Sequence, residues 1–69
     1  MVNTEALEKK IQQSGLRKKY IADNLNISIQ TLRLKITNQN EFWCSEVEKL
    51  IKLLKLSPKE VDYIFFTSK

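Results

Sequence analysis

The sequence predicts an all-α fold, in which five short helices form one compact bundle. Apolar residues recur three and four positions apart, as Leu7 and Ile11 do, and this spacing places them on one face of a helix. The chain holds only one Gly and one Pro, too few for the many turns of an all-β protein. Its 69 residues suffice for a single domain, 1–69. The predicted helices cover residues 4–14, 17–25, 28–36, 45–56 and 58–66.

The residues that flank these segments are of the types that start or stop helices. Ser, Thr and Asn side chains accept hydrogen bonds from the unpaired amide groups of a first helical turn. Gly and Asn readily adopt the left-handed conformation in which many helices end. On this basis we expect helix starts at Asn3 or Thr4 and at Ser28, and helix ends at Gly15 and near Asn26.

Two capping boxes mark the last two helices. In each, a Ser is followed three residues later by a Glu, so that each side chain can accept a hydrogen bond from the other residue's backbone amide. The pairs are Ser45 with Glu48 and Ser57 with Glu60. Pro58 suits the first helical position, because a helix leaves that amide unpaired in any case. The apolar stripes that follow are Val47, Leu50, Ile51 and Leu54, and then Val61, Ile64 and Phe65.

Composition and charge favour a folded domain with an anionic partner. Hydrophobic residues make up 42% of the chain and charged residues 29%, which is typical of folded rather than disordered proteins. Twelve Lys and Arg against eight Asp and Glu give a net charge of +4. Cys44, the one cysteine, cannot form an internal disulfide. Because no apolar run could span a bilayer and no signal peptide is evident, we expect a cytoplasmic protein without a membrane partner.

The chain lacks the residues that most catalytic and metal sites need. It has no His, no Gly-rich phosphate loop and no cluster of Cys and His. Its acidic residues fall at predicted caps or on polar helix faces. We therefore expect that the protein is not an enzyme and has no metal, no other cofactor and no small-molecule ligand.

The functional signal lies in residues 18–36. The two helices predicted there are joined by about three residues, too few for antiparallel packing, so they should cross steeply. The outward side of the second helix is polar or basic, with Gln30 and Arg33, and with Lys35 nearby. A Gln side chain can form two hydrogen bonds with adenine, and Arg can form two with guanine. Leu34 should also be exposed there, where it could contact a thymine methyl group.

A basic run opens the first helix of this pair. Arg17, Lys18 and Lys19 stand at a helix start, where the helix macrodipole disfavours positive charge. This arrangement becomes favourable when a DNA phosphate binds at the same helix end, held by the side chains and the amide groups together. The segment therefore predicts contact with the DNA backbone as well as with bases.

Residues across this helix pair and the loop after it match a known pattern. They are YIADNLNIS at 20–28, then Gln30-Thr31-Leu32, Lys35-Ile36 and Glu41-Phe42. With these residues the chain resembles the Cro/lambda-repressor (XRE-type) family of helix-turn-helix transcriptional regulators. It is similar in particular to small phage and mobile-element regulators of low-GC Gram-positive bacteria. The flanking helices match in spacing, so the resemblance covers nearly the whole chain.

The resemblance implies a compact lambda-repressor-like fold with a helix-turn-helix. It also implies a sequence-specific transcriptional regulator, a Cro-like repressor, that binds a near-palindromic double-stranded DNA operator as a homodimer. The recognition helix would be 28–36, lying in the major groove. The DNA-binding residues carried over in this way are Arg17, Lys18, Ser28, Ile29, Gln30, Thr31, Arg33, Leu34, Asn38 and Asn40.

Within that set, the resemblance separates two roles and shows two departures. Base-reading positions fall on Ser28, Ile29, Gln30, Arg33 and Leu34, whereas Arg17, Lys18 and the loop 38–40 match phosphate-contacting positions. The turn has Asn26 where the family usually has Gly. Ile29 and Leu34 replace side chains that are usually polar.

The two aliphatic residues support a second hypothesis. Ile29 and Leu34 on one exposed helix face could dock a protein partner, in an interaction module that kept the fold and lost specific DNA binding. Ile29 could equally complete the hydrophobic core. The sequence leaves these interpretations open.

Simpler structural roles are expected for the remaining conspicuous residues. Large aromatic side chains usually lie in the core. Phe66 could cover the end of the bundle or pack across a dimer interface. We expect Phe42, Trp43 and Phe65 in the core, Cys44 half-buried, and Lys49, Lys52 and Lys55 on a solvated helix face.

Overall fold

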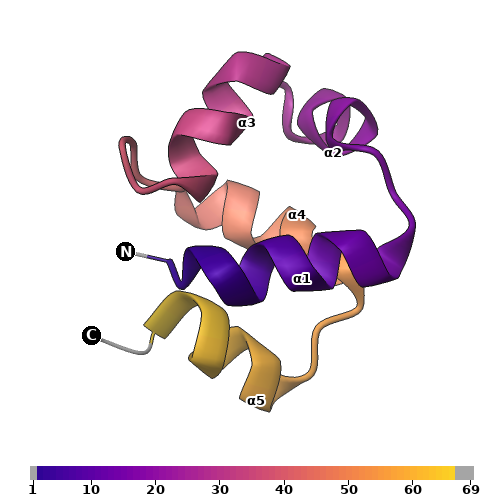
Figure 1. The fold of residues 1–69 in the computed structure, drawn as a ribbon, viewed down its shortest axis with the longest axis vertical. Coiled ribbons are helices and arrows are strands. Elements are labelled where there is room, and N and C mark those ends of the chain that lie inside the picture. The colour runs from indigo at the N-terminus through magenta and orange to yellow at the C-terminus, as the bar shows by residue number, and fades with distance from the viewer. Residues whose placement is uncertain (1, 67–69) are drawn as a thin grey trace.

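The computed structural model describes residues 2–66, and this part of the chain is all-helical (Figure 1). It contains no strand, which confirms the predicted all-α class. The helices are α1 (Thr4–Ser14), α2 (Lys18–Leu25), α3 (Ile29–Ile36), α4 (Cys44–Leu54) and α5 (Pro58–Val61), with a π-helical turn, η1 (Asp62–Phe66), continuing α5.

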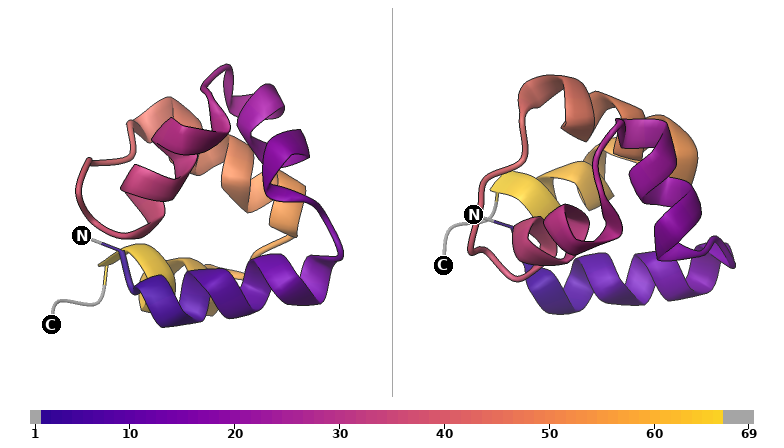
Figure 2. Two further views of the ribbon diagram at one scale, coloured as in Figure 1. Left: turned by 45° about the horizontal axis from the view of Figure 1, so that its top comes forward. Right: turned by 90° about the horizontal axis from the view of Figure 1, so that it is seen from above.

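Helix α1 is the element around which the others are arranged. Figure 1 shows α2 and α3 on one side of α1 and α5 on the other, with α4 behind. Helix α1 contacts α3, α4 and η1, while α2 packs against both α3 and α4. The result is a compact body with principal extents of 26 × 24 × 20 Å. This arrangement leaves one side of the α2–α3 pair facing outward (Figure 2).

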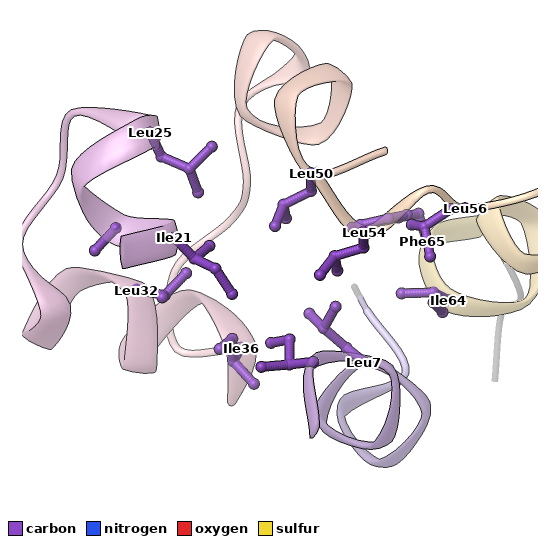
Figure 3. Close-up of a cluster of buried hydrophobic side chains, with 12 residues drawn as sticks. Leu7, Ile21, Leu25, Leu32, Ile36, Leu50, Leu54, Leu56, Ile64 and Phe65 are labelled. Atoms are coloured by element: carbon purple, nitrogen blue, oxygen red, sulfur yellow. The ribbon is translucent and has the colours of Figure 1, made fainter. Parts of the chain in front are cut away.

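The core is made mostly of aliphatic side chains from α1, α2, α3, α4 and η1, together with Phe65 of η1 and Leu56 between α4 and α5 (Figure 3). Full burial of such a side chain contributes about 1.5–3 kcal/mol to folding. Most of the buried side chains are those that helical spacing in the sequence placed on the apolar faces, so these predicted core faces are confirmed. The largest fully buried side chains are Leu7, Ile21, Leu32, Ile36 and Leu50.

Most of the predicted helix ends are confirmed. The Asn3 side chain accepts a hydrogen bond from the Ala6 amide (3.1 Å), and Gly15 ends α1 with φ 76°. Asn26 ends α2 in the left-handed conformation, with φ 60°. The Ser28 hydroxyl then accepts from the amide three residues later (3.0 Å), so it caps α3. The turn between α2 and α3 is thus fixed by local side-chain chemistry.

The predicted start and end of α4 are wrong. The helix begins at Cys44, ahead of the expected Ser45 cap, because the Glu46 carboxylate accepts a hydrogen bond from the Trp43 amide (2.9 Å). It ends at Leu54 rather than at residue 56, since Lys55 adopts the left-handed conformation with φ 53°. Only half of a capping box forms, from one Glu earlier than the sequence indicated, because the Trp43 indole is a donor and cannot accept from the Glu46 amide.

The second capping box is confirmed, whereas the helix it starts differs from expectation. Ser57 and Glu60 cap each other's amides at 3.2 and 2.8 Å. After Val61 the chain winds as a π-helical turn instead of continuing as one α-helix to residue 66. This wider turn buries both Ile64 and Phe65, and the Ile64 carbonyl accepts from the Asn3 amide (2.7 Å). The end of the described chain is thereby joined to the start of α1.

The aromatic residues divide between core and surface. Phe42 is half-buried against the core and lies edge-on to the buried Phe65, with 6.1 Å between ring centroids, as predicted. Trp43 was expected in the core, but 69% of it is exposed. Cys44, expected to be half-buried, is exposed too. Phe66 is likewise exposed, so it does not cover the end of the bundle.

Two further predictions concern the surface. The lysines of α4 and its C-terminal cap are exposed, as expected for a solvated helix face. No helix among residues 2–66 is both long enough and apolar enough to cross a bilayer.

Candidate nucleic-acid interface

One side of α3 faces outward and carries chemically distinct groups. Successive residues of a helix are turned by about 100°, which places Gln30, Arg33, Leu34 and Thr37 on a single strip. Gln30, Arg33 and Thr37 are exposed, and Leu34 is half-buried without packing against the core. We refer to these four residues as the outer face of α3. Gln30, Arg33 and Leu34 were predicted from helical spacing to lie on this face, whereas Thr37, one turn beyond Arg33, was not.

The two long polar side chains of the outer face have no internal partners. Neither the Gln30 amide nor the Arg33 guanidinium makes a hydrogen bond or an ion pair within residues 2–66. Both therefore keep all of their donors available to a ligand. The Thr37 hydroxyl, in contrast, donates to the Arg33 carbonyl (2.9 Å) and helps to end the helix.

Arg17 and Lys18, at the start of α2, differ in availability. Arg17 precedes the first helical residue, is exposed, and its guanidinium has no partner in the described chain. Lys18 is half-buried, and its ammonium pairs with Glu8 of α1 at 2.9 Å. The next lysine, Lys19, lies 3.6 Å from Asp23 one turn later. Of the basic residues in this run, only Arg17 therefore presents an uncompensated charge.

Two of the expected base-reading positions, Ser28 and Ile29, and the expected DNA-binding residue Thr31 lie elsewhere than on the outer face. Ile29 is half-buried and packs against the core, which confirms the alternative that it completes the core. The Ser28 hydroxyl donates to the Thr31 hydroxyl (2.9 Å) while it accepts the Thr31 amide. Thr31 is half-buried on the side of α3 that faces the start of α4. All three residues lie at the N-terminal end of α3, and of the three only Ser28 is exposed.

Lys35 does not belong to the outward surface, contrary to expectation. Only 5% of it is exposed, and its ammonium lies 2.5 Å from Glu46 of α4. The Trp43 ring covers this ammonium, with 5.0 Å between the nitrogen and the ring centroid. One signal was available in the sequence: three residues after Leu32, Lys35 points only about 60° away from that buried side chain. Its partner, 11 residues further on, could not be identified from such spacing.

The loop after α3 contains two asparagines that were expected to contact phosphate, and they differ in their availability. Asn40 is exposed, and its side chain makes no hydrogen bond within residues 2–66. Asn38 adopts the left-handed conformation with φ 67°, and its side-chain amide bonds to Val2 and Thr4. Asn40 therefore remains available to a phosphate, whereas the Asn38 amide is already engaged within the protein.

No other part of the described chain offers a better site. Residues 2–66 contain no group of three or more His, Cys, Asp or Glu side chains that could hold a metal ion. A surface hollow lies between α1 and the α5–η1 segment and includes the Lys10–Glu60 ion pair (2.7 Å). It is widely open and includes no residue of the outer face of α3.

Comparison with known proteins finds no matching family model, no matching curated protein and no matching solved structure.

Proposed function

We propose that this protein binds double-stranded DNA in a sequence-specific manner, with α2 and α3 acting as a helix-turn-helix and α3 lying in the major groove. The supporting observation is the outer face of α3, where Gln30 and Arg33 are exposed and have no partner within the described chain. A short turn joins α3 to α2, at whose start stands the unpaired Arg17. Base-reading groups on one helix and a phosphate-binding group on the preceding one are the two components that this mode of recognition needs.

Each exposed group of the outer face suits a particular base. Arg33 can form two hydrogen bonds with the major-groove edge of guanine, and Gln30 can do the same with adenine. Leu34, half-buried and without core contacts, offers an aliphatic surface for a thymine methyl group. The outer face thus presents side chains for three different bases within one and a half helical turns, which favours discrimination between DNA sequences.

The phosphate contacts proposed here are fewer than the sequence suggested. Arg17 and Asn40 are exposed and unpartnered, so they are the best candidates. Lys18 would have to leave Glu8, or share its charge with it, to bind a phosphate. The net charge of +4 assists the approach to DNA at any sequence.

A regulatory role is the form of this proposal that the family resemblance favours. The protein would act as a Cro-like repressor on a near-palindromic operator, bound as a homodimer. The alternative, a protein-interaction module, is favoured only by Leu34, because Ile29 packs against the core and contributes no exposed aliphatic patch.

The proposal is tested by selecting bound sequences from a pool of random DNA duplexes. We expect an enriched motif whose affinity falls steeply as salt is raised, since bound phosphates release counterions. The symmetry of the motif reports whether the protein binds as a dimer. Failure to enrich any sequence, together with no binding at low salt, would favour the protein-interaction module.

A further inference from the structure

The loop after α3 is tied to the residues that precede α1 by a pair of reciprocal hydrogen bonds. The Val2 amide donates to the Asn38 side-chain oxygen (2.8 Å), and the Asn38 side-chain nitrogen donates to the Val2 carbonyl (2.9 Å). We call this pair the Asn38–Val2 clamp. It joins residues 36 positions apart, and Figures 1 and 2 show the start of α1 beside this loop.

Thr4 extends the clamp to the last turn of α3. Its hydroxyl donates to the Ile36 carbonyl (2.6 Å) and accepts from the Asn38 side-chain nitrogen (3.3 Å). Helix ends leave carbonyl groups without partners, so a hydroxyl at this place both satisfies Ile36 and fixes the end of α3 against α1. With these contacts, the Asn38 side chain uses both amide hydrogens and its oxygen inside the protein.

The position suits asparagine better than other residue types. Asn38 has φ 67°, a conformation that Asn and Gly adopt far more readily than other residues. Gly would preserve this backbone conformation but would lose the clamp, because it has no side chain. Asp would keep an acceptor for the Val2 amide and lose the donor to the Val2 carbonyl. Only Asn supplies the conformation, the donor and the acceptor together.

The clamp also determines where the following loop lies. The amides of Gln39 and Asn40 both donate to the Leu34 carbonyl, at 2.8 and 3.2 Å, so the loop folds back over the end of α3. Leu34 is itself on the outer face of α3, and Asn40 is exposed in the loop. Fixing Asn38 against α1 therefore fixes the loop and the end of the outer face with respect to the rest of the molecule.

We propose that Asn38 is a positioning residue for DNA binding, which acts through Val2 and Thr4 and does not touch the DNA. This inference rests on the proposed function and replaces the direct phosphate contact that the sequence suggested for Asn38. It makes the placement of the recognition helix depend on residues ahead of α1.

A double-mutant cycle distinguishes positioning from direct contact. Asn38→Gly removes the side chain and keeps the backbone conformation, while Val2→Pro removes the donor on the other side of the clamp. Each change should weaken binding to the selected operator about five- to tenfold, the effect of losing one or two hydrogen bonds. The affinity of the double variant for the operator should equal that of the more strongly impaired single variant, because both changes break the same clamp. Fully additive losses would show that Asn38 acts independently of Val2 and would overturn the proposal.

Asn40→Gly is the matched control in the same loop. Its side chain is exposed and unpartnered, so its effect on affinity should add to that of Val2→Pro. Thr4→Val gives a second cycle with Asn38→Gly, in case Val2→Pro disturbs the start of α1. Non-additivity is expected there too, through the hydrogen bond between the Asn38 side chain and the Thr4 hydroxyl.

Hydrogen exchange tests the clamp without DNA. Asn38→Gly and Val2→Pro should accelerate exchange at the Gln39 and Asn40 amides to a similar degree, while the core amide of Leu50 stays protected. If both variants leave these loop amides unchanged, the clamp does not hold the loop and the inference fails, even if the protein binds DNA. If exchange accelerates but the wild-type chain binds no DNA, the proposed function fails and with it any role of the clamp in DNA binding.

Discussion

Two cationic residues of α3, only two positions apart, are used in opposite ways. Arg33 is exposed on the outer face, and its guanidinium has no partner among residues 2–66. Lys35 is 5% exposed, bonded to Glu46 and covered by the Trp43 ring. A positive charge on this helix therefore does not by itself indicate a DNA contact. What matters is whether the fold already supplies the partner.

The same contrast applies along the whole helix. On the outer face the side-chain donors of Gln30 and Arg33 are free within residues 2–66. The opposite side of α3 is fixed by Lys35, and its C-terminal end by the Asn38–Val2 clamp. A helix that reads bases must be held rigidly, because a rotation of one residue would exchange exposed and buried side chains. The buried ion pair fixes α3 to α4, and the clamp fixes the end of α3 to the start of α1.

The largest expected effect comes from breaking the buried ion pair. Lys35→Met should lower the free energy of unfolding by roughly 3 kcal/mol, because it leaves the Glu46 carboxylate buried without its counter-charge. Arg33→Met, the matched control on the exposed side, should change it by less than about 0.5 kcal/mol. Urea unfolding measures both. Equal effects of the two substitutions would mean that the contrast between the two cations has no energetic basis.

The second prediction concerns the outer face. Arg33→Ala should lose about 1–3 kcal/mol of discrimination between the selected operator and a variant with one guanine replaced, while it leaves folding unchanged. Gln30→Ala should do the same at an adenine. Titrations with labelled duplexes of both sequences give the ratio of affinities. If Arg33→Ala weakens cognate and random DNA by the same factor, Arg33 contacts phosphate and reads no base.

A third, smaller effect should separate the two basic residues at the start of α2. Arg17→Ala should weaken specific and random DNA alike and reduce the slope of log affinity against log salt by about one, because one phosphate contact is lost. Lys18→Ala should change the slope by less, since Glu8 already compensates its ammonium charge. The control is Lys55→Ala, an exposed lysine at the end of α4. A larger change of slope for Lys18 than for Arg17 would show that Lys18 leaves Glu8 on binding.

The smallest predicted effect lies far from α3, at Glu60. Its hydrogen bond to Lys10, supported by the Ser57 amide, holds the pKa of this carboxyl below its ordinary value of 4.5. A lowered pKa stabilises the folded state at higher pH, and this contribution disappears as the pH falls through the folded-state pKa. The difference in melting temperature between wild type and Glu60→Gln should therefore shrink in acid. The control is Glu48→Gln, at a carboxylate without a hydrogen bond or ion pair in the described chain. This variant keeps Glu60, so its melting temperature should fall in acid as that of the wild type does.

Much of the local structure could be predicted because its causes lie within a few residues of each other. Asn3, Ser28 and Ser57 cap amides no more than three positions away, and Gly15 and Asn26 end helices through their own backbone preference. Helical spacing likewise placed Gln30, Arg33 and Leu34 on one face. Where the prediction of an end failed, as at α4, a carboxylate bonded to an amide outside the segment expected to be helical.

Local sequence patterns were enough to predict the helices, most of their ends, the apolar stripes that build the core and the exposed face of α3. Contacts between distant helices, in contrast, are needed to explain why Lys35 and the Asn38 side chain face inward and why Lys18 is paired. The exposure of Trp43 also became evident only in the folded structure. The physical reason is the range of the interactions. Helical periodicity and capping act over three or four residues, whereas the partners of Lys35, Lys18 and Asn38 lie 11, 10 and 36 positions away and meet them only once the bundle has formed.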